Sequence, residues 1–341
     1  MAKAPIGIGI IGGGYMGKAH AVAMASVGAV FDTTLRPHLV SIAASSLASA
    51  ARYRDAFGFQ RAAADWRTVV EDPAVEALVV ATPPRLHRVV SEAALALGKP
   101  VLCEKPLAPT LDDSRAMVAA AEAAGVANMV GFNYIRTPAS QFAHHLVANG
   151  EIGTVTWFRG EHVEDYMADP LAPANWRTAD PSSGALGDVG SLIYIAALRL
   201  IGPVSELAAV LETRHATRPG QDGPEAVVND DQMQIMCRFE SGALGHMHAS
   251  RIQTGRKMGY GYEIVGTEGA IRFDQEDQNA VWLYRRDGTA SEAGFRKILA
   301  GPEHPDYQAF CQGPGHGTGY QDQITIEAKA TPMTVTVTAR T

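Results

Sequence analysis

Hydrophobic and polar positions follow two different patterns in the two halves of the chain. Up to about residue 131, short continuous apolar runs alternate with longer segments of helical pattern. The apolar runs are 6–11, 39–44, 76–82, 99–104 and 127–132. Strands without polar alternation are buried on both faces, which is typical of a parallel sheet covered by helices. The pattern predicts a doubly wound α/β domain over residues 1–131.

After about residue 150, the pattern changes to short strands separated by turn signals. Seven such segments are 154–163, 206–216, 230–240, 242–252, 259–267, 269–276 and 279–287. A long apolar helix is predicted over 184–202, and the Gly- and Pro-rich segments 216–228 and 300–320 are predicted to be loops. Many strands with few helices predict an α+β domain over 132–330, built on a large open mixed or antiparallel sheet. Residues 331–341 alternate like a strand, and we expect an atypical tail that is disordered or adds an edge strand.

Composition narrows the function classes. The length of 341 residues agrees with two domains, and 46% apolar with 19% charged residues is typical of a soluble globular protein. A net charge of −7 disfavours a nucleic-acid partner, because binding phosphate backbones requires a basic face. Three widely spaced cysteines favour a reducing compartment without a disulfide framework. With no signal-peptide layout and no apolar stretch of about 18 residues, we expect a cytoplasmic protein without a membrane segment.

No metal site is expected from the sequence. His246 and His248 alternate on a predicted strand, so both side chains point the same way. A metal pair is one interpretation, but the spacing offers no third ligand, and a half-buried strand explains the pattern more simply.

The stretch IGIGIIGGGYMGKAH, residues 6–20, places a Gly-rich turn between a predicted strand and an amphipathic segment. Gly12, Gly14 and Gly17 have the G-x-G-x-x-G spacing of dinucleotide sites. The first glycine permits the tight turn, the second lets a pyrophosphate approach, and the third lets helix and strand pack closely. The positive helix end then holds the phosphates. The pattern predicts a Rossmann-type NAD(P) site, and the simpler alternative is a plain strand-to-helix turn.

The choice between NAD and NADP depends on the end of the second strand, where NAD enzymes usually carry a carboxylate for the ribose 2′-OH. Ala44, Ser45 and Ser46 occupy this place. The missing carboxylate slightly favours NADP, and both cofactors stay open.

Further motifs carry a family resemblance. They are ATPPRLH at 81–87, Glu104-Lys105-Pro106, GFNYIRTPA at 131–139, NWR at 175–177, GALGDVGS at 184–191 and GTEGAIRF at 266–273. Through them, the chain resembles the Gfo/Idh/MocA family of sugar and cyclitol dehydrogenases over nearly its whole length. The resemblance implies an NAD(P)-dependent oxidoreductase that takes a hydride from a secondary hydroxyl of a sugar, anhydrosugar or cyclitol. Because large exposed sheet faces need covering, we also expect a homo-oligomer, a dimer or tetramer.

Lys105 is the predicted catalytic base. Oxidising an alcohol requires removal of the O–H proton and stabilisation of the developing alkoxide. Lys105 follows an apolar strand at the carboxyl edge of the sheet, where α/β proteins bind ligands, and partial desolvation there would lower its pKa from about 10.4. The resemblance implies this role, and a solvated turn lysine is the alternative. The family often has a cis bond before Pro106, although sequence alone favours trans.

The second family motif is altered in this chain. The family typically reads G-D-x-x-x-H, with both side chains on one helical face. Asp188 is present, but Leu192 stands at the histidine position and cannot transfer a proton. Proton transfer then falls to Lys105 with Asp188. Two alternatives stay open: a catalytically impaired dinucleotide-binding sensor or partner, and an NAD-dependent glycosidase with no net redox change.

The remaining predicted contacts divide between cofactor and substrate. Those with the cofactor are Gly12, Gly14, Tyr15, Met16, Gly17, Ala44, Ser45, Ser46, Thr82, Pro83, His87, Glu104, Lys105 and Asn133. Those with the substrate are Tyr134, His162, Asp165, Trp176, Arg177, Asp188 and Leu192. An aromatic face and a guanidinium, as at 176–177, suit a polyol.

Overall fold

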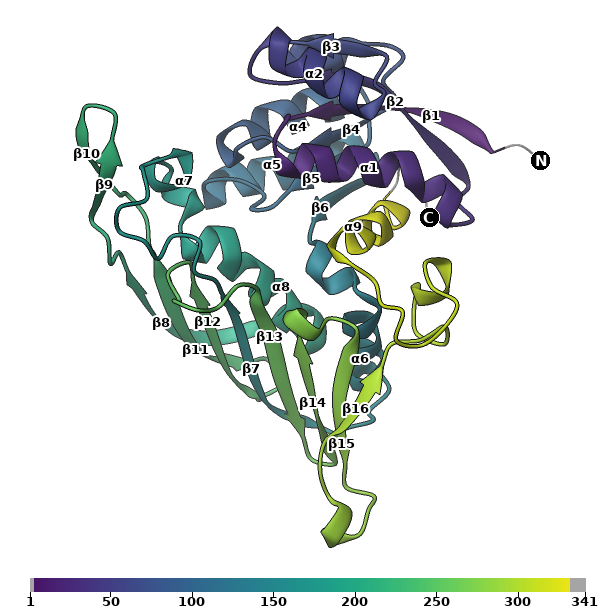
Figure 1. Cartoon of the computed structure of the whole chain (residues 1–341), viewed down its shortest axis with the longest axis vertical. Helices are drawn as coiled ribbons and strands as arrows, with labels where there is room; N and C mark the ends of the chain where they lie inside the picture. Colours follow the sequence, from purple (N-terminus) through teal and green to yellow (C-terminus); the bar gives the residue numbers. More distant parts are fainter. Residues whose placement is uncertain (1–2, 332–341) are drawn as a thin grey trace. The chain divides into compact units, whose positions relative to one another are not determined.

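The computed structural model describes residues 3–331 and divides into two compact units (Figure 1). Among the described residues, the first unit comprises 3–136 and 319–331, and the second comprises Thr137–Thr318. The sequence predicted a boundary after residue 131 and a second domain reaching 330. The contacts instead place helix α9, Tyr320–Lys329, in the first unit. The predicted tail lies outside the described residues, apart from its first residue, Thr331.

The first unit is built on a six-stranded parallel sheet in the order β3-β2-β1-β4-β5-β6. The strands are β1 Ala4–Ile11, β2 Leu35–Ala43, β3 Arg61–Ala63, β4 Ala77–Val80, β5 Val101–Glu104 and β6 Asn128–Gly131. The doubly wound prediction is confirmed, and the short β3 is the one strand of this sheet that the apolar runs missed. The strand order reverses at β1 and β4, and α/β proteins bind ligands at the carboxyl ends of strands near such a point.

Helices cover this sheet on both sides. They are α1 Tyr15–Val30, α2 Leu47–Phe57, α3 Trp66–Glu71, α4 His87–Ala96 and α5 Leu111–Ala124, together with α9. One core cluster joins Ile8 and Ile10 of β1 to α1 and to Ile324 of α9. The other joins Ile11 of the same strand to Val90 of α4. Burial on both faces explains why the strands read as continuous apolar runs.

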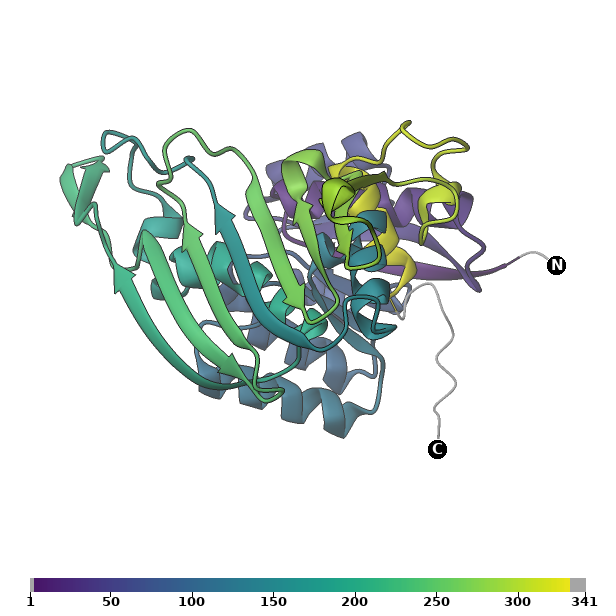
Figure 2. The ribbon, with the colours of Figure 1, turned by 90° about the horizontal axis from the view of Figure 1, so that it is seen from below.

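The second unit is built on an eight-stranded mixed sheet in the order β16-β15-β14-β13-β7-β12-β11-β8, drawn as a curved surface in Figure 2. The strands are β7 Val155–Val163, β8 Val204–Glu212, β11 Gln232–Phe239, β12 Leu244–Ser250, β13 Gly259–Gly266, β14 Gly269–Asp274, β15 Ala280–Arg285 and β16 Arg296–Leu299. Strands β7 and β12 pair in parallel, and the other pairs are antiparallel. The predicted α+β class with an open mixed sheet is confirmed.

Two local predictions in the second unit need correction, and strand β16 was not predicted. The predicted loop 216–228 contains a hairpin, β9 Thr217–Gly220 and β10 Gly223–Ala226, and β16 directly precedes the predicted loop 300–320. The single helix predicted over 184–202 is divided. A π-helical turn, Leu186–Gly190, leads into helix α8, Ser191–Leu200. The unit also holds α6, Pro138–Ala148, and the short α7, Trp176–Ala179.

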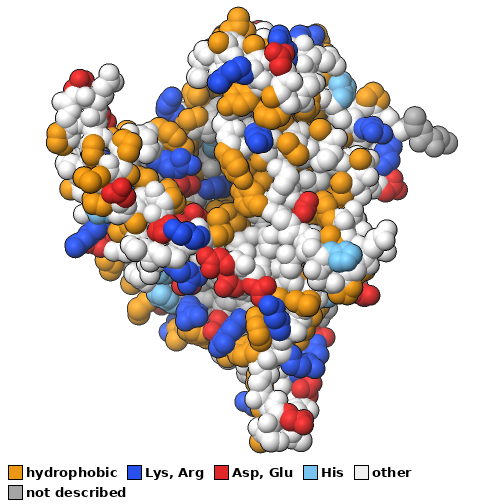
Figure 3. Space-filling view, viewed as in Figure 1, with side chains coloured by type: hydrophobic (Ala, Val, Ile, Leu, Met, Phe, Trp, Pro, Cys, Tyr) orange, Lys and Arg blue, Asp and Glu red, His pale blue; other side chains and the backbone are white. Residues whose placement is uncertain are grey.

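None of the helices formed by residues 3–331 is long and apolar enough to cross a membrane. On the face drawn in Figure 3, acidic and basic side chains are interspersed.

Candidate functional site

The turn between β1 and α1 has the geometry of a dinucleotide loop. Gly12 has a φ of 118°, a left-handed conformation, and a Cβ there would lie 2.2 Å from the carbonyl oxygen of Ala81. A Cβ at Gly17 would lie 1.9 Å from the carbonyl oxygen of Gly12. A Cβ at Gly14 would meet nothing within 4 Å. Two of the glycines are therefore required by close packing, and Gly14 borders open space.

The start of helix α1 suits a bound phosphate. Gly14 is its N-cap, no side chain caps the helix, and no acidic residue lies in its first turn. The backbone N–H groups of such a turn are donors for an anion. Together with the space beside Gly14, this start fits the pyrophosphate of a dinucleotide. Tyr15, a predicted contact, is 67% exposed at the same end of the helix.

The open space beside Gly14 gives a direct prediction. We expect Gly14→Val to fold normally and to raise the Kd for NADH by at least about 100-fold, because the new side chain occupies the space of the pyrophosphate. A fluorescence titration with NADH measures the effect. The control is Gly288→Val, since a Cβ at this exposed turn also meets nothing within 4 Å. Equal affinity of the Gly14 variant and the wild type would contradict a dinucleotide at this turn.

The end of β2 carries no charged group for the ribose. The N–H of Ala44 donates to the carbonyl oxygen of Ala63 at 3.3 Å. The hydroxyl of Ser46 caps α2 by accepting from the N–H of Ser49 at 3.2 Å. Ser46 therefore has a structural role, while Ser45 is exposed next to it.

His87 is buried and connects two loops at the carboxyl edge of the sheet. Its Nε2 lies 2.8 Å from the carbonyl oxygen of Thr82, and its Nδ1 lies 2.9 Å from that of Pro106. The loop after β4 is thereby tied to the loop after β5, in which Lys105 lies. His87 was predicted to contact cofactor, and its contacts in the structure are with backbone.

Lys105 lies directly after β5, at the carboxyl edge where the sequence predicted it. It is half-buried, and its peptide bond to Pro106 is cis. The backbone N–H of Lys105 donates to Oε2 of Glu104 at 3.2 Å. Glu104, predicted as a cofactor contact, is 6% exposed, so its carboxylate faces the interior of the unit.

An aromatic group lies near the end of β6. Asn133 and Tyr134, both predicted contacts, are buried in a short 3₁₀ turn. The ring of Tyr134 lies 5.9 Å from that of Tyr320, which in turn lies 5.9 Å from that of Tyr15. Burial raises the pKa of Tyr320, so its phenol stays protonated at neutral pH. The sequence carried no signal that α9 supplies this ring.

In the second unit, the structure brings three predicted residues together: Trp176, Arg177 and Asp188. Oδ2 of Asp188 accepts from Nε of Arg177 at 3.3 Å and from the hydroxyl of Tyr166 at 2.8 Å. The guanidinium of Arg177 lies 4.4 Å from the centre of the Trp176 ring. Burial and the charge of Asp188 raise the pKa of Tyr166, so its hydroxyl donates rather than accepts. Sequence reasoning missed Tyr166, although it directly follows Asp165.

His162 and Asp165 have partners of their own. The Nε2 of buried His162 lies 2.9 Å from Oε1 of Glu164. Asp165 accepts from Nζ of Lys257 at 2.6 Å and from the N–H of Gly255 at 3.1 Å. The hydrogen bond from Lys257, followed by that from Gly255, lowers the pKa of Asp165. A substrate role for His162 and Asp165 stays a prediction.

Leu192 lies in the apolar interior of the second unit, with 2% of its surface exposed. Asp188, by contrast, is half-buried in the π-helical turn that precedes α8. The α-helical spacing that would place positions 188 and 192 on one face is interrupted by this turn, because its hydrogen bonds span five residues. Such turns occur frequently at functional sites, which agrees with the network around Asp188.

The fold and the site are typical of a two-domain nicotinamide-dependent oxidoreductase. They combine a dinucleotide turn, a lysine after β5 and a second unit built on an open mixed sheet. The model of the GFO_IDH_MocA oxidoreductase family, described as an NAD-binding Rossmann fold, matches residues 6–132. The model of the GFO/IDH/MocA C-terminal domain matches residues 140–272. The chain belongs to the Gfo/Idh/MocA family.

Similar proteins agree with this assignment. Levoglucosan dehydrogenase of Pseudarthrobacter phenanthrenivorans is 37% identical over 340 aligned positions, covering 95% of this chain and 87% of that protein. 1,5-anhydro-D-fructose reductase of Ensifer adhaerens is 32% identical, covering 68% of this chain and 67% of that protein. A structure of levoglucosan dehydrogenase with NADH and levoglucosan superposes with a TM-score of 0.92 at 37% identity, covering 95% and 88%. The structure of an oxidoreductase domain protein from Kribbella flavida has a TM-score of 0.92 at 38% identity, covering 96% and 88%.

Proposed function

We propose that this protein oxidises a secondary hydroxyl of a sugar, anhydrosugar or cyclitol with a nicotinamide dinucleotide as the oxidant. The observation that carries the proposal is Lys105 at the carboxyl end of β5, in a unit whose Gly14 turn fits a pyrophosphate. The 37% identity to levoglucosan dehydrogenase makes an anhydrosugar the first substrate class to test. A bound nicotinamide supplies the hydride acceptor.

The residues of this chain handle the proton and orient the substrate. The amine of Lys105 takes the proton of the reacting hydroxyl, so that the oxygen forms a carbonyl as the C–H bond breaks. Asp188, held by Tyr166 and Arg177, accepts hydrogen bonds from substrate hydroxyls. The Trp176 ring offers an apolar face to a sugar. Because Leu192 cannot relay a proton, the proton leaves through Lys105.

We propose that the protein accepts both NAD and NADP. The missing carboxylate at 44–46 slightly favours NADP, because nothing there repels a 2′-phosphate. The complexes of levoglucosan dehydrogenase with NADH favour NAD. We therefore expect kcat/KM values for NAD and NADP that differ by less than about 100-fold, which corresponds to a preference below about 3 kcal/mol.

Incubation with a panel of sugars, anhydrosugars and cyclitols tests the proposal. The reduced-nicotinamide absorbance is followed with each cofactor, and turnover of at least one substrate is the expected result. No turnover with either cofactor, combined with tight NADH binding, would instead indicate a dinucleotide-binding protein without catalysis. Release of free sugar without reduced cofactor would indicate an NAD-dependent glycosidase.

We also propose that a second copy of the chain covers part of the eight-stranded sheet. On neighbouring strands, Val210 of β8 is 70% exposed, Met236 of β11 is 68% exposed and Leu244 of β12 is 49% exposed. Along β11, the exposed residues alternate with the buried Ile235 and Cys237, so the face opposite the core carries this apolar group. Adjacent exposed apolar side chains favour burial against a partner.

The free thiols of Cys103, Cys237 and Cys311 support a cytoplasmic location.

The exposed apolar face of the sheet gives a second prediction. We expect Met236→Glu to lower the molar mass measured by light scattering from an oligomer to a smaller species, because a desolvated carboxylate destabilises an interface. Val118→Glu is the control, since Val118 is 48% exposed on helix α5 of the first unit. A wild type that is monomeric at micromolar concentration, or an unchanged mass in the Met236 variant, would contradict the proposal.

A further inference from the structure

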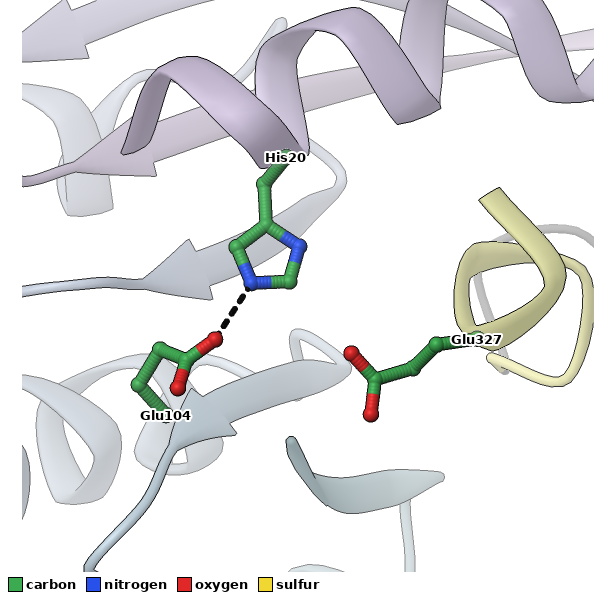
Figure 4. A group of neighbouring side chains, drawn as sticks. All are labelled: His20, Glu104 and Glu327. Carbon is green, nitrogen blue, oxygen red and sulfur yellow. Dashed lines mark hydrogen bonds and ion pairs between the residues drawn. The ribbon is translucent and has the colours of Figure 1, made fainter. Parts of the chain in front are cut away.

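Three side chains from distant parts of the sequence meet inside the first unit (Figure 4). They are His20 of α1, Glu104 at the end of β5 and Glu327 of α9. Their exposed fractions are 0%, 6% and 0%, and their ligand-type atoms all lie within 4.8 Å of one another. We call these three residues the buried triad. Burying ionisable groups in the interior of a protein costs free energy, so a buried group of this kind needs compensating interactions.

The first two members of the triad form an ion pair. The Nε2 of His20 lies 2.7 Å from Oε1 of Glu104. Burial alone lowers the pKa of His20, but the hydrogen bond and charge of Glu104, with a smaller effect of Glu327, raise it above its ordinary value overall. The contact with Glu104 therefore favours the protonated imidazolium of His20.

The third member holds the proton that titrates near neutrality. Figure 4 shows the carboxyl group of Glu327 pointing toward the pair. Burial raises the pKa of Glu327 to about 7. The charge of Glu104 adds to this, while His20, Arg136 and the backbone N–H of Phe132 oppose it. As the pH rises through that value, the loss of this proton adds one negative charge to the triad.

The triad is attached directly to the turn that carries Lys105. Glu104 contacts His20 through Oε1, and its Oε2 accepts from the backbone N–H of Lys105 at 3.2 Å. Gly131 on the neighbouring strand leaves room for this carboxylate, since a Cβ there would lie 3.2 Å from Oε1 of Glu104. One carboxylate thus connects the buried imidazolium to the first peptide group of the turn.

We propose that the buried triad is a proton-sharing positioning group that holds the backbone of Lys105 for catalysis. While Glu327 is protonated, the imidazolium of His20 pairs with Glu104 alone, and Glu104 holds the turn. When Glu327 loses its proton, a second negative charge shares the same imidazolium, and its attraction to Glu104 is weakened. The inference rests on the proposed role of Lys105, and it couples helix α9 to the catalytic turn.

Thermal unfolding tests the titration of the triad without any need for activity. The pKa of Glu327 is higher in the folded chain than the value near 4.3 of an unfolded one, so the stability it contributes is complete at low pH and is lost as pH rises through about 7. In Glu327→Gln the side chain is neutral at every pH, so the variant does not lose this stability as the pH rises. We expect the Tm of this variant, relative to wild type, to rise by about 5 °C between about pH 5.5 and pH 8.5.

The labelling of Lys105 tests the positioning step. We expect the rate of its acetylation by acetic anhydride, measured by mass spectrometry relative to exposed Lys18, to change with an inflection near pH 7. Glu327→Gln is expected to remove this inflection. His20→Asn is expected to move it to higher pH, because the imidazolium that favours the ionised Glu327 is gone. In the dehydrogenase assay, we expect the pH profile of kcat to show the same ionisation and the KM for the sugar not to show it.

The control variant is Glu122→Gln, which removes an exposed carboxylate of helix α5 and is expected to behave as wild type. A pH-independent Tm difference for Glu327→Gln, or an inflection in Lys105 labelling that both triad variants leave in place, would overturn the inference. One equivalent of a divalent metal in the purified protein would also overturn it, because the cation would replace the shared proton. Inactivity of a wild type that shows both expected results would count against the dehydrogenase proposal alone.

Discussion

Lys105→Met will lower kcat by at least about 1,000-fold and leave the Kd for NADH within about threefold of wild type. Methionine keeps much of the length of the side chain, but it has no group that can take a proton. Lys105→Arg is expected to be nearly as damaging, because a guanidinium keeps its proton at any pH suited to the enzyme. Steady-state kinetics with the best substrate, together with an NADH titration, separate loss of chemistry from loss of cofactor.

Lys297→Met is the matched control for this substitution. Lys297 lies on the edge strand β16 and forms an ion pair with Asp277, so it carries a similar charge in a partly exposed setting. Its replacement is expected to change kcat by less than about twofold. If Lys105→Met kept a tenth or more of the wild-type kcat, the amine would not be the base that the mechanism requires.

Asp188→Asn will lower kcat/KM for the sugar by about 100-fold, and it will do so without weakening NADH binding. The carboxylate balances the charge of Arg177 and accepts from the hydroxyl of Tyr166. An amide removes the charge and leaves one of these donors poorly matched. Tyr166→Phe removes a single donor and is expected to cost about tenfold, which corresponds to about 1.4 kcal/mol.

The control for Asp188 is Asp222→Asn, at the exposed turn between β9 and β10. This variant removes the same charge from the same unit and is expected to retain wild-type kinetics. Equal kinetic constants for Asp188→Asn and wild type would show that the network around Asp188 does not serve the reaction.

Local patterns predicted the parts of the protein that depend on neighbours in sequence. Gly12, Gly14 and Gly17 follow one strand and begin one helix, so their spacing could be recognised from local sequence, although the close approach of Gly12 to Ala81 could not. The position of Lys105 at the edge of the sheet was also predicted from a local pattern, the apolar run that precedes it. Continuous apolar strands indicated the parallel sheet, because each such strand has to be buried on both faces.

The parts that the sequence did not predict depend on contacts across long stretches of chain. Glu327 meets His20 only because α9 packs against α1, and nothing in the pattern of α9 indicates that partner. Tyr166 follows Glu164 and Asp165, and nothing in this local sequence indicates that its hydroxyl donates to Asp188, 22 residues away. The same packing of α9 explains why the predicted boundary at 330 differs from the observed unit.

The division of the predicted helix 184–202 has a similar cause. A continuous apolar pattern predicts one α-helix, and no rule of spacing signals the inserted residue of a π-turn. Close packing explains the glycines of this segment. A Cβ at Gly187 would lie 1.9 Å from the carbonyl oxygen of Ser182, and one at Gly184 would lie 2.2 Å from Oδ1 of Asp230. The contact with Asp230 is a tertiary one, so local spacing alone could not predict the path of the chain up to Asp188.

Transfer of an isotope label shows whether the hydrogen on the reacting carbon moves to the nicotinamide. A sugar substrate deuterated at the carbon of the reacting hydroxyl is incubated with the protein and oxidised cofactor, and the products are analysed by mass spectrometry. We expect one deuterium in the reduced nicotinamide for each carbonyl product formed, and a rate of this transfer at least about 1,000-fold lower with Lys105→Met. Substrate consumption with the deuterium still on the sugar and no reduced cofactor at the end would contradict this expectation.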